Sequence, residues 1–276
     1  MKKKICIIAG ALNEGSTLGR FFEKHCWADE IIILDSGSTD DTEIICSQYN
    51  RKFFQYPANG NYNQRFGWAL MQTKADWVFI MDLDELVSPE LKSEIDKILE
   101  NDNDNDVYEA YEFIRFNFFM DQPLRHGGWS GYSLKIFKRG CVSFDGNFYH
   151  ERPIVNGRIG RLNGTVLHYF SPNIHWFLQK INYSSEFDLS GYYERYGVLS
   201  SREFKWLLLT RPLKNFCKCY IKRKGYKDGL IGFIYGALIW AVDVIRICKY
   251  GERFIIKNPN VLDADKIPDP WKCRIK

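Results

Sequence analysis

The chain has 276 residues, of which 45% are hydrophobic and 16% aromatic, enough apolar material for one large α/β domain or for one domain with an appendage. The net charge is +4, but residues 202–230 hold nine Lys or Arg and two Asp or Glu, so this segment carries +7 and the remainder −3. Such a local basic block indicates an anionic partner surface, either a membrane or a nucleic acid. The eight cysteines include no C-x-x-C pair, which argues against a zinc knuckle and fits a reducing cytosol.

The first apolar stretch, residues 5–12, follows three lysines and resembles the start of a signal peptide. It is too short for that role, and Asn13 and Glu14 follow it with no small-residue cleavage site. We therefore expect a first β-strand here. No segment reaches the roughly 20 apolar residues without charges that a membrane-spanning helix requires.

Short apolar runs then alternate with helical patterns along the first hundred residues. The expected strands are residues 5–8, 31–34, 53–54 and 77–81, and the expected helices are residues 16–24, 39–48, 63–73 and 89–99. This alternation is typical of βαβ units and a parallel sheet.

The pattern changes after residue 100. The polar run 101–106 predicts a surface turn, and residues 108–119 and 132–138 read as longer, antiparallel strands. Helical patterns dominate from Ile174 onward. We expect an α/β domain over residues 1–172 and a helical region over residues 173–276.

Two aspartates, Asp82 and Asp84, follow the apolar strand 77–81. Successive strand side chains point to opposite faces, so residues two apart share a face and both carboxylates can meet one ligand. Parallel sheets bind ligands beyond the carboxyl ends of their strands, and two hard oxygen donors there suit Mg²⁺ or Mn²⁺ holding a diphosphate. A plainer interpretation, which can hold at the same time, is an acidic turn before a helix that begins at Ser88 and Pro89.

Polar residues also follow the first two strands. Glu14 lies after the first, and Asp35 ends the second, where its carboxylate can accept hydrogen bonds from a ribose or a base. We expect Asp40 to cap the next helix. The nearby glycines lack the G-x-G-x-x-G spacing of a dinucleotide site, and the chain has no G-x-x-x-x-G-K-[ST] loop.

Four stretches carry a more specific signal: residues 11–14 (ALNE), 27–42 (WADEIIILDSGSTDDT), 63–70 (NQRFGWAL) and 76–85 (DWVFIMDLDE). In their loops, order and spacing they resemble the nucleotide-sugar domain of GT-A glycosyltransferases of family 2, especially the bacterial lipopolysaccharide-core β-glucosyltransferases. The resemblance spans about residues 4–250. It implies a GT-A (Rossmann-like), mostly parallel sheet flanked by helices, with a helical C-terminal appendage.

The resemblance implies a UDP-sugar donor, with UDP-glucose, UDP-galactose and their N-acetyl forms all open. The donor-binding residues that it implies are Ala11, Asn13, Glu14, Asp35, Gln64, Arg65 and Asp82. The uridine would lie against Asn13, Glu14 and Asp35, and Arg65 would bind the diphosphate or pair with a strand-end carboxylate instead.

The same resemblance implies a Mn²⁺ or Mg²⁺ cofactor. Asp84 would be the main metal ligand, with Asp82 as a further ligand or near the ribose or a bridging water. His168 would complete the metal shell or be an ordinary strand-end histidine.

The pair His150-Glu151 resembles the acceptor side of these enzymes. A carboxylate must take the proton of the acceptor hydroxyl, so Glu151 is the expected general base of an inverting reaction. The chain lacks the Glu-Asp and Gln-x-x-Arg-Trp motifs of processive family members, which indicates addition of a single sugar.

The acceptor expected from the resemblance is a glycan or glycolipid of lipopolysaccharide, lipooligosaccharide or capsule type. Alternatives are a metal-dependent phosphohydrolase with Asp82 as nucleophile, a nucleotidyltransferase that makes sugar nucleotides, and a non-catalytic binder of anionic surfaces. The phosphohydrolase motif requires a Thr at the position where this chain has Leu86. A nucleotidyltransferase requires a Gly-rich basic loop after the first strand, and this chain does not have one there.

The basic block precedes Leu230–Val242, thirteen residues without a charge, which would make a helix about 20 Å long. This helix is either buried against the catalytic domain or lies among lipid headgroups, with Tyr235 and Trp240 at the boundary. We expect a cytoplasmic protein that is peripheral on the cytoplasmic face of the inner membrane, with no nucleic-acid partner.

Overall fold

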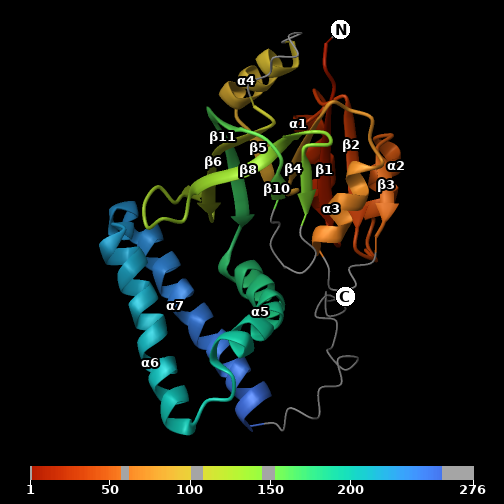
Figure 1. Cartoon of the computed structure of the whole chain (residues 1–276). Helices are drawn as coiled ribbons and strands as arrows, with labels where there is room; N and C mark the ends of the chain where they lie inside the picture. The colour runs from red at the N-terminus through yellow and green to blue at the C-terminus, as the bar shows by residue number, and fades with distance from the viewer. Residues whose placement is uncertain (1, 57–61, 101–107, 145–152, 257–276) are drawn as a thin grey trace. The chain divides into compact units, whose positions relative to one another are not determined.

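The computed structural model describes residues 2–56, 62–100, 108–144 and 153–256 (Figure 1). They form two compact units. One unit comprises Met1–Phe118 with Ser130–Phe170, and the other comprises Phe119–Trp129 with Ser171–Lys276. The second unit therefore includes a segment from the middle of the chain. The boundary expected after residue 172 stays a prediction.

The first unit is an α/β unit. Its elements are β1 (Ile5–Ala11), α1 (Gly15–Lys24), β2 (Glu30–Asp35), α2 (Thr42–Gln48), β3 (Lys52–Gln55), α3 (Tyr62–Leu70), β4 (Trp77–Met81), β5 (Glu85–Val87), α4 (Pro89–Glu100), β6 (Ala110–Phe119), β8 (Gly131–Lys138), β9 (Val142–Phe144), β10 (Pro153–Val155) and β11 (Ile159–Ser171).

The main sheet has the strand order β3-β2-β1-β4-β8-β6-β11-β5, with the two-residue β7 (Gln122–Pro123) beside β6. The first four strands pair in parallel, whereas β4–β8, β8–β6 and β11–β5 pair antiparallel. The predicted α/β class with a helix-flanked sheet is confirmed, and the sheet is mixed. The antiparallel strands predicted at 108–119 and 132–138 are β6 and β8.

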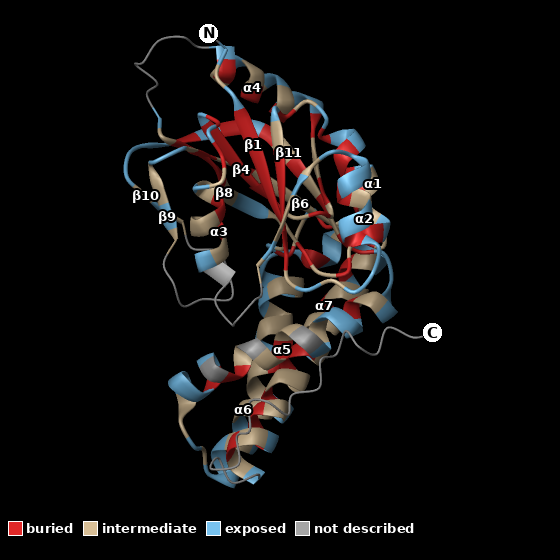
Figure 2. Ribbon diagram, turned by 90° about the vertical axis from the view of Figure 1, so that its right-hand side faces the viewer, coloured by how far each residue is buried: buried red, intermediate tan, exposed pale blue. Residues whose placement is uncertain are grey.

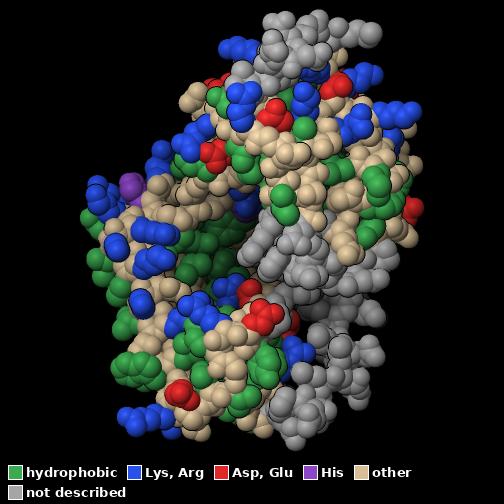
Figure 3. Space-filling view, viewed as in Figure 1, with side chains coloured by type: hydrophobic (Ala, Val, Ile, Leu, Met, Phe, Trp, Pro, Cys, Tyr) green, Lys and Arg blue, Asp and Glu red, His purple; other side chains and the backbone are tan. Residues whose placement is uncertain are grey.

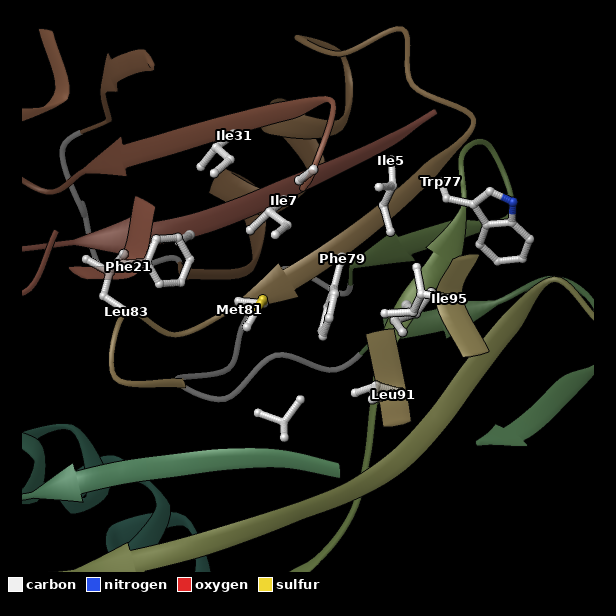
Figure 4. Packing of buried hydrophobic residues seen from close by; sticks show 14 of the residues in the cluster. Ile5, Ile7, Phe21, Ile31, Trp77, Phe79, Met81, Leu83, Leu91 and Ile95 are labelled. Atoms are coloured by element: carbon white, nitrogen blue, oxygen red, sulfur yellow. The ribbon is translucent and has the colours of Figure 1, made fainter. Parts of the chain in front are cut away.

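The apolar strand residues form a core on both faces of the parallel half of the sheet. On one face, Phe21 of α1 shares a buried cluster with Ile7 and Phe79, and Figure 4 shows it near Leu83 and Met81. On the other, Phe66 of α3 packs with residues such as Ile8 and Val78. Figure 2 shows the resulting band of buried residues along β1 and β4. Each large side chain buried in this way contributes about 1.5–3 kcal/mol, which fixes the strand ends in place.

The second unit is helical. Its elements are α5 (Ile174–Tyr196), α6 (Ser201–Phe216), the π-helix η1 (Cys217–Lys222), the 3-10 helix η2 (Gly225–Asp228), α7 (Gly229–Gly251) and the π-helix η3 (Glu252–Ile256).

Polar caps and ring contacts hold the helical unit together. The Asn173 side chain accepts a hydrogen bond from the backbone N–H of Trp176 (2.8 Å), and Ser200 and Glu203 form a capping box that begins α6. The mid-chain segment joins this unit through the rings of Phe119 and Trp129, which contact Tyr235 of α7. Tyr235 therefore packs inward, contrary to its expected place at a lipid boundary.

The helical stretch Gly225–Ile256 is long and apolar enough, by length and composition alone, to cross a membrane; 28% of its most apolar window is buried. The expectation concerned uncharged stretches, and the uncharged run within this helix is still shorter than roughly 20 residues. The helix runs beyond the thirteen uncharged residues and through Asp243, Arg246 and Lys249.

Candidate functional site

The two aspartates lie in a tight turn that follows β4. The backbone N–H of Glu85 donates to the carbonyl oxygen of Asp82 (3.1 Å), and the N–H of Asp82 donates to Oε2 of Glu85 (2.9 Å). The expectation that Asp82 and Asp84 share one face of a strand was therefore wrong. This turn brings their carboxylates together at the carboxyl end of β4.

His168 joins the two aspartates through a strand pairing that the sequence did not reveal. β11 runs antiparallel to β5, which places His168 opposite Glu85. The N–H of Tyr169 donates to the carbonyl oxygen of Asp84 (2.9 Å), and Nε2 of His168 lies 3.3 Å from Oδ1 of Asp84.

Asp82, Asp84 and His168 each offer one ligand atom, and these atoms lie within 4.8 Å of one another. Carboxylate oxygens and an imidazole nitrogen at this spacing fit a divalent cation. The three residues named from the sequence as metal ligands thus come together.

Two cations flank this cluster. Arg115 of β6 forms ion pairs with Asp82 and Glu85, and Nζ of Lys135 of β8 lies 3.2 Å from Oδ2 of Asp82 and 3.3 Å from Oε1 of Glu85. Glu85 is fully buried. Burial, and then the charge of Asp82, raise the pKa of Glu85, while Lys135 and Arg115 oppose this rise.

Sequence reasoning missed Arg115, Lys135 and Glu85. The register of β6 and β8 pairs Tyr111 with Ile136 but Glu112 with Leu134, so Lys135 is the extra residue of a β-bulge. A bulge re-aims a side chain, and it carries no clear signal in the sequence.

The donor residues expected after β1 and β2 form one hydrogen-bonded pair of loops. Ala11 lies opposite Asp35 in the parallel register. Asn13 adopts a positive φ of 56°, its N–H donates to Oγ of Ser38 (2.7 Å), and its Oδ1 accepts from the N–H of Thr39 (2.8 Å). The structure therefore brings Ala11, Asn13 and Asp35 to one edge of the sheet.

Asp35 itself is 1% exposed and organises its own turn. Its Oδ2 accepts hydrogen bonds from the N–H groups of Gly37 (2.9 Å) and Ser38 (2.8 Å), and its Oδ1 accepts from the hydroxyl of Ser38. The carboxylate thus shapes the loop that would meet a nucleoside.

The Asp40 carboxylate links the starts of two helices. Oδ1 accepts from the N–H of Thr42 (3.1 Å), which begins α2, and Oδ2 accepts from the N–H of Gly15 (3.0 Å), which begins α1. Asp41 occupies the N-cap position of α2, yet Asp40 supplies the bond that was expected of a cap. Glu14 precedes α1, and its Oε2 accepts from the Thr17 hydroxyl (2.9 Å).

Arg65 and Gln64 come from α3. The Arg65 guanidinium lies against Gly10 of β1, where an added Cβ would come within 2.8 Å of it, and it lies 3.4 Å from Oγ of Ser36. It also lies over the ring of Phe66 at 4.8 Å. Gln64 is exposed. Arg65 therefore reaches the same loop edge as the residues after β1 and β2.

The expected catalytic residues, His150 and Glu151, lie outside the described residues. On either side of them, Phe144 of β9 pairs with Pro153 of β10 in an antiparallel arrangement. Their assignment stays a prediction.

Comparisons with known proteins agree with these features. The family model described as "Glycosyl transferase family 2" matches residues 6–182. The uncharacterized glycosyltransferase RT0209 of Rickettsia typhi is 28% identical over 276 residues, covering 95% of this chain and 91% of the relative. The lipopolysaccharide core biosynthesis glycosyltransferase LpsC of Rhizobium meliloti is 26% identical over 268 residues, covering 92% of this chain and 94% of the relative.

Among solved structures, glucosyl-3-phosphoglycerate synthase from Mycobacterium tuberculosis in complex with Mn²⁺, UDP and phosphoglyceric acid aligns with a TM-score of 0.43 and 18% identity, covering 72% of this chain and 80% of that one.

Proposed function

This chain belongs to glycosyl transferase family 2. We propose that it moves one sugar from a UDP-sugar to a glycan or glycolipid acceptor, and that a divalent cation assists the transfer. The match to a relative named as a lipopolysaccharide core biosynthesis glycosyltransferase confirms the resemblance to enzymes of that class. The observation that carries the proposal is the cluster of Asp82, Asp84 and His168 at the end of β4. Neither a phosphohydrolase nor a nucleotidyltransferase is favoured by the family match.

Asp84 and His168 would hold the cation. Asp82 would lie near the ribose or a bridging water, because Arg115 and Lys135 already neutralise its carboxylate. The imidazole nitrogen in this set favours Mn²⁺ over Mg²⁺, which prefers oxygen ligands alone. A bound cation would neutralise the charge that develops on the departing diphosphate.

The donor would lie along the edge formed by the loops after β1 and β2. Ala11, Asn13, Glu14 and Asp35 would bind the uridine. Arg65, with Gln64 beside it on α3, would bind the diphosphate, because a guanidinium donates two parallel hydrogen bonds to the oxygens of a phosphate group.

Glu151, supported by His150, would act as the general base. The acceptor hydroxyl oxygen forms a bond to the anomeric carbon while the bond from that carbon to the UDP oxygen breaks. The hydroxyl proton passes to Glu151 and the electron pair leaves with UDP. Attack from the side opposite UDP inverts the anomeric centre, so an α-linked UDP-sugar gives a β-linked product.

A panel of UDP-sugars tests the donor. The correct donor should raise the melting temperature in the presence of Mn²⁺, because a ligand that binds only the folded state stabilises it by mass action. Proton NMR of the transfer product should then show a β-anomeric signal. An α-linked product would contradict inversion, and a panel without any shift would contradict the donor class.

We also propose that the protein is peripheral on the cytoplasmic face of the inner membrane, near a lipopolysaccharide-type acceptor. Two neighbouring helices leave large apolar side chains exposed: Trp206, Leu209 and Leu213 on α6, and Leu230, Phe233 and Trp240 on α7. The turn between these helices exposes Lys218, Lys222, Arg223, Lys224 and Lys227. Figure 3 shows Lys and Arg side chains gathered beside hydrophobic ones over α6 and this turn.

The charged residues of α7 favour a peripheral mode over a spanning one. Asp243 is 4% exposed and its Oδ2 accepts from Nδ2 of Asn215 of α6 (2.5 Å). Arg246 and Lys249 form ion pairs with acidic residues of α5 at 2.7 Å. The second half of α7 therefore belongs to a helical bundle, and the apolar faces of α6 and α7 are left for the interface.

A further inference from the structure

Strand β6 directs two alternate side chains into the metal cluster. Residues two apart on a strand share a face, and Arg115 and Asn117 are such a pair. Arg115 engages Asp82 and Glu85, as described above. Asn117 engages the other end of the cluster, because its Oδ1 lies 2.7 Å from Nδ1 of His168.

This contact favours the form of His168 that carries hydrogen on Nδ1. An amide oxygen only accepts hydrogen bonds, so Nδ1 must be the donor. A neutral imidazole has one N–H, so Nε2 then keeps its lone pair. That nitrogen lies 3.3 Å from Oδ1 of Asp84, on the side of the ring where a cation would be held.

The contact is also well fixed. His168 is 7% exposed, and its ring lies against that of Phe170 at 5.4 Å. The backbone N–H of Asn117 donates to Oγ of Ser130 (3.0 Å), which holds the end of β6.

We propose that Asn117 is a positioning residue that prepares Nε2 of His168 as a metal ligand by holding the ring in its Nδ1–H form. The inference rests on the proposed metal site and adds a residue that touches neither metal nor donor. Partners of this kind set the orientation and basicity of a ligating histidine, and their loss typically costs about 10- to 100-fold in metal affinity.

The first test reads the ring itself in the full, metal-free wild-type chain. The chain has five histidines, so selective ¹⁵N labelling with His168→Gln as the assignment control is practicable. We expect the ¹⁵N shifts of His168 to report hydrogen on Nδ1. Hydrogen on Nε2 with none on Nδ1 in the wild type would overturn the proposal without any variant at Asn117.

The second test measures Mn²⁺ affinity by following the EPR signal of free Mn²⁺. Asn117→Leu should weaken binding by about 10- to 100-fold. Asn117→Asp should keep wild-type affinity or bind more tightly, because a carboxylate also accepts from Nδ1–H. Asn163→Leu, an exposed position on β11, is the matched control and should leave affinity unchanged.

The outcomes separate this inference from the proposed function. A wild type that does not bind Mn²⁺ would contradict the metal site. A wild type that binds, together with an Asn117→Leu variant that binds equally well, would overturn the role of Asn117 alone. Equal losses for Asn117→Asp and Asn117→Leu would mean that the amide donates, which also overturns it.

Discussion

At the scale of single residues, the end of β4 gathers three carboxylates and two cations in one partly buried cluster. Charges taken out of water are costly unless they are paired. Arg115 and Lys135 pair with Asp82 and Glu85, and this leaves Asp84 and His168 as the side chains best placed to take a metal ion. Asp82 and Glu85 are thus paired with cationic side chains, whereas Asp84 lies beside His168.

The general base can be tested by a single substitution. Glu151→Gln keeps the size of the side chain but cannot accept the acceptor proton. We expect kcat to fall by about 10²-fold or more, with donor affinity little changed. Steady-state kinetics with the donor found in the panel measures both, and turnover near the wild-type rate would move the search for the base to Asp145.

His25 makes the stability of the first unit depend on pH. It is buried, Nδ1 donates to the carbonyl oxygen of Phe21 (2.8 Å), and burial lowers its pKa from 6.5 to about 4. Below about pH 6.5 the unfolded chain binds a proton that the folded chain does not. Stability should therefore fall between about pH 6.5 and pH 4, by about 3 kcal/mol in total.

Urea unfolding at a series of pH values measures this effect. His25→Leu removes the titrating group, so the difference between wild type and variant isolates its share from that of the carboxylates. Parallel stability curves for the two proteins would show that His25 is not responsible.

At the scale of elements, β11 holds the site together because it carries His168 and also packs on α4. An added Cβ at Gly164 would lie 2.2 Å from the backbone nitrogen of Leu91, an approach that only backbone movement can relieve. We expect Gly164→Ala to destabilise the protein by about 3 kcal/mol, at the upper end of overpacking costs. Gly131→Ala on β8 meets nothing within 4 Å and serves as the control in urea unfolding. Equal midpoints for the two variants would contradict this packing.

The parallel half of the sheet could be predicted because β1, β2 and β4 are buried apolar runs, each followed by a helical pattern. β4, predicted at residues 77–81, begins at Trp77 and ends at Met81. The other half gave weaker signals. β5 has three residues, and β11 alternates between buried and exposed positions without the apolar run that marks a central strand.

From strand patterns alone, the residues of the site were likewise predictable only where they follow the parallel strands. Asp82, Asp84 and Asp35 stand at ends of predictable strands, so their common edge follows from the parallel order. Arg115, Asn117 and Lys135 reach the site through antiparallel pairing and a bulge, which depend on contacts between distant parts of the chain. The predicted surface turn at residues 101–106 lies outside the described residues.

At the scale of the whole molecule, we expect the basic turn between α6 and α7 to bring the protein to anionic membranes. Each exposed Lys or Arg near such a surface contributes about 1 kcal/mol, so binding should weaken steeply with salt. Flotation with vesicles that contain anionic lipid measures this binding. The wild type should float at low salt, and the Lys222/Arg223/Lys224→Ala variant should float much less.

The Lys24/Lys74/Lys97→Ala variant is the matched control, because it removes three exposed lysines from the first unit instead. It should float like the wild type. Equal loss in both variants would point to general charge attraction, and a wild type that stays soluble at low salt would refute the membrane role.

The central claim is that a divalent cation held by Asp84 binds the diphosphate of a UDP-sugar. Calorimetric titration of UDP into wild type and Asp84→Asn, each in Mn²⁺ and in EDTA, tests it most directly. The account predicts that wild-type affinity for UDP depends on Mn²⁺, and that Asp84→Asn, which keeps the side-chain volume but loses the charge, binds UDP equally weakly in both conditions. Wild-type affinity that is unchanged in EDTA, or a variant that keeps its response to Mn²⁺, would contradict it.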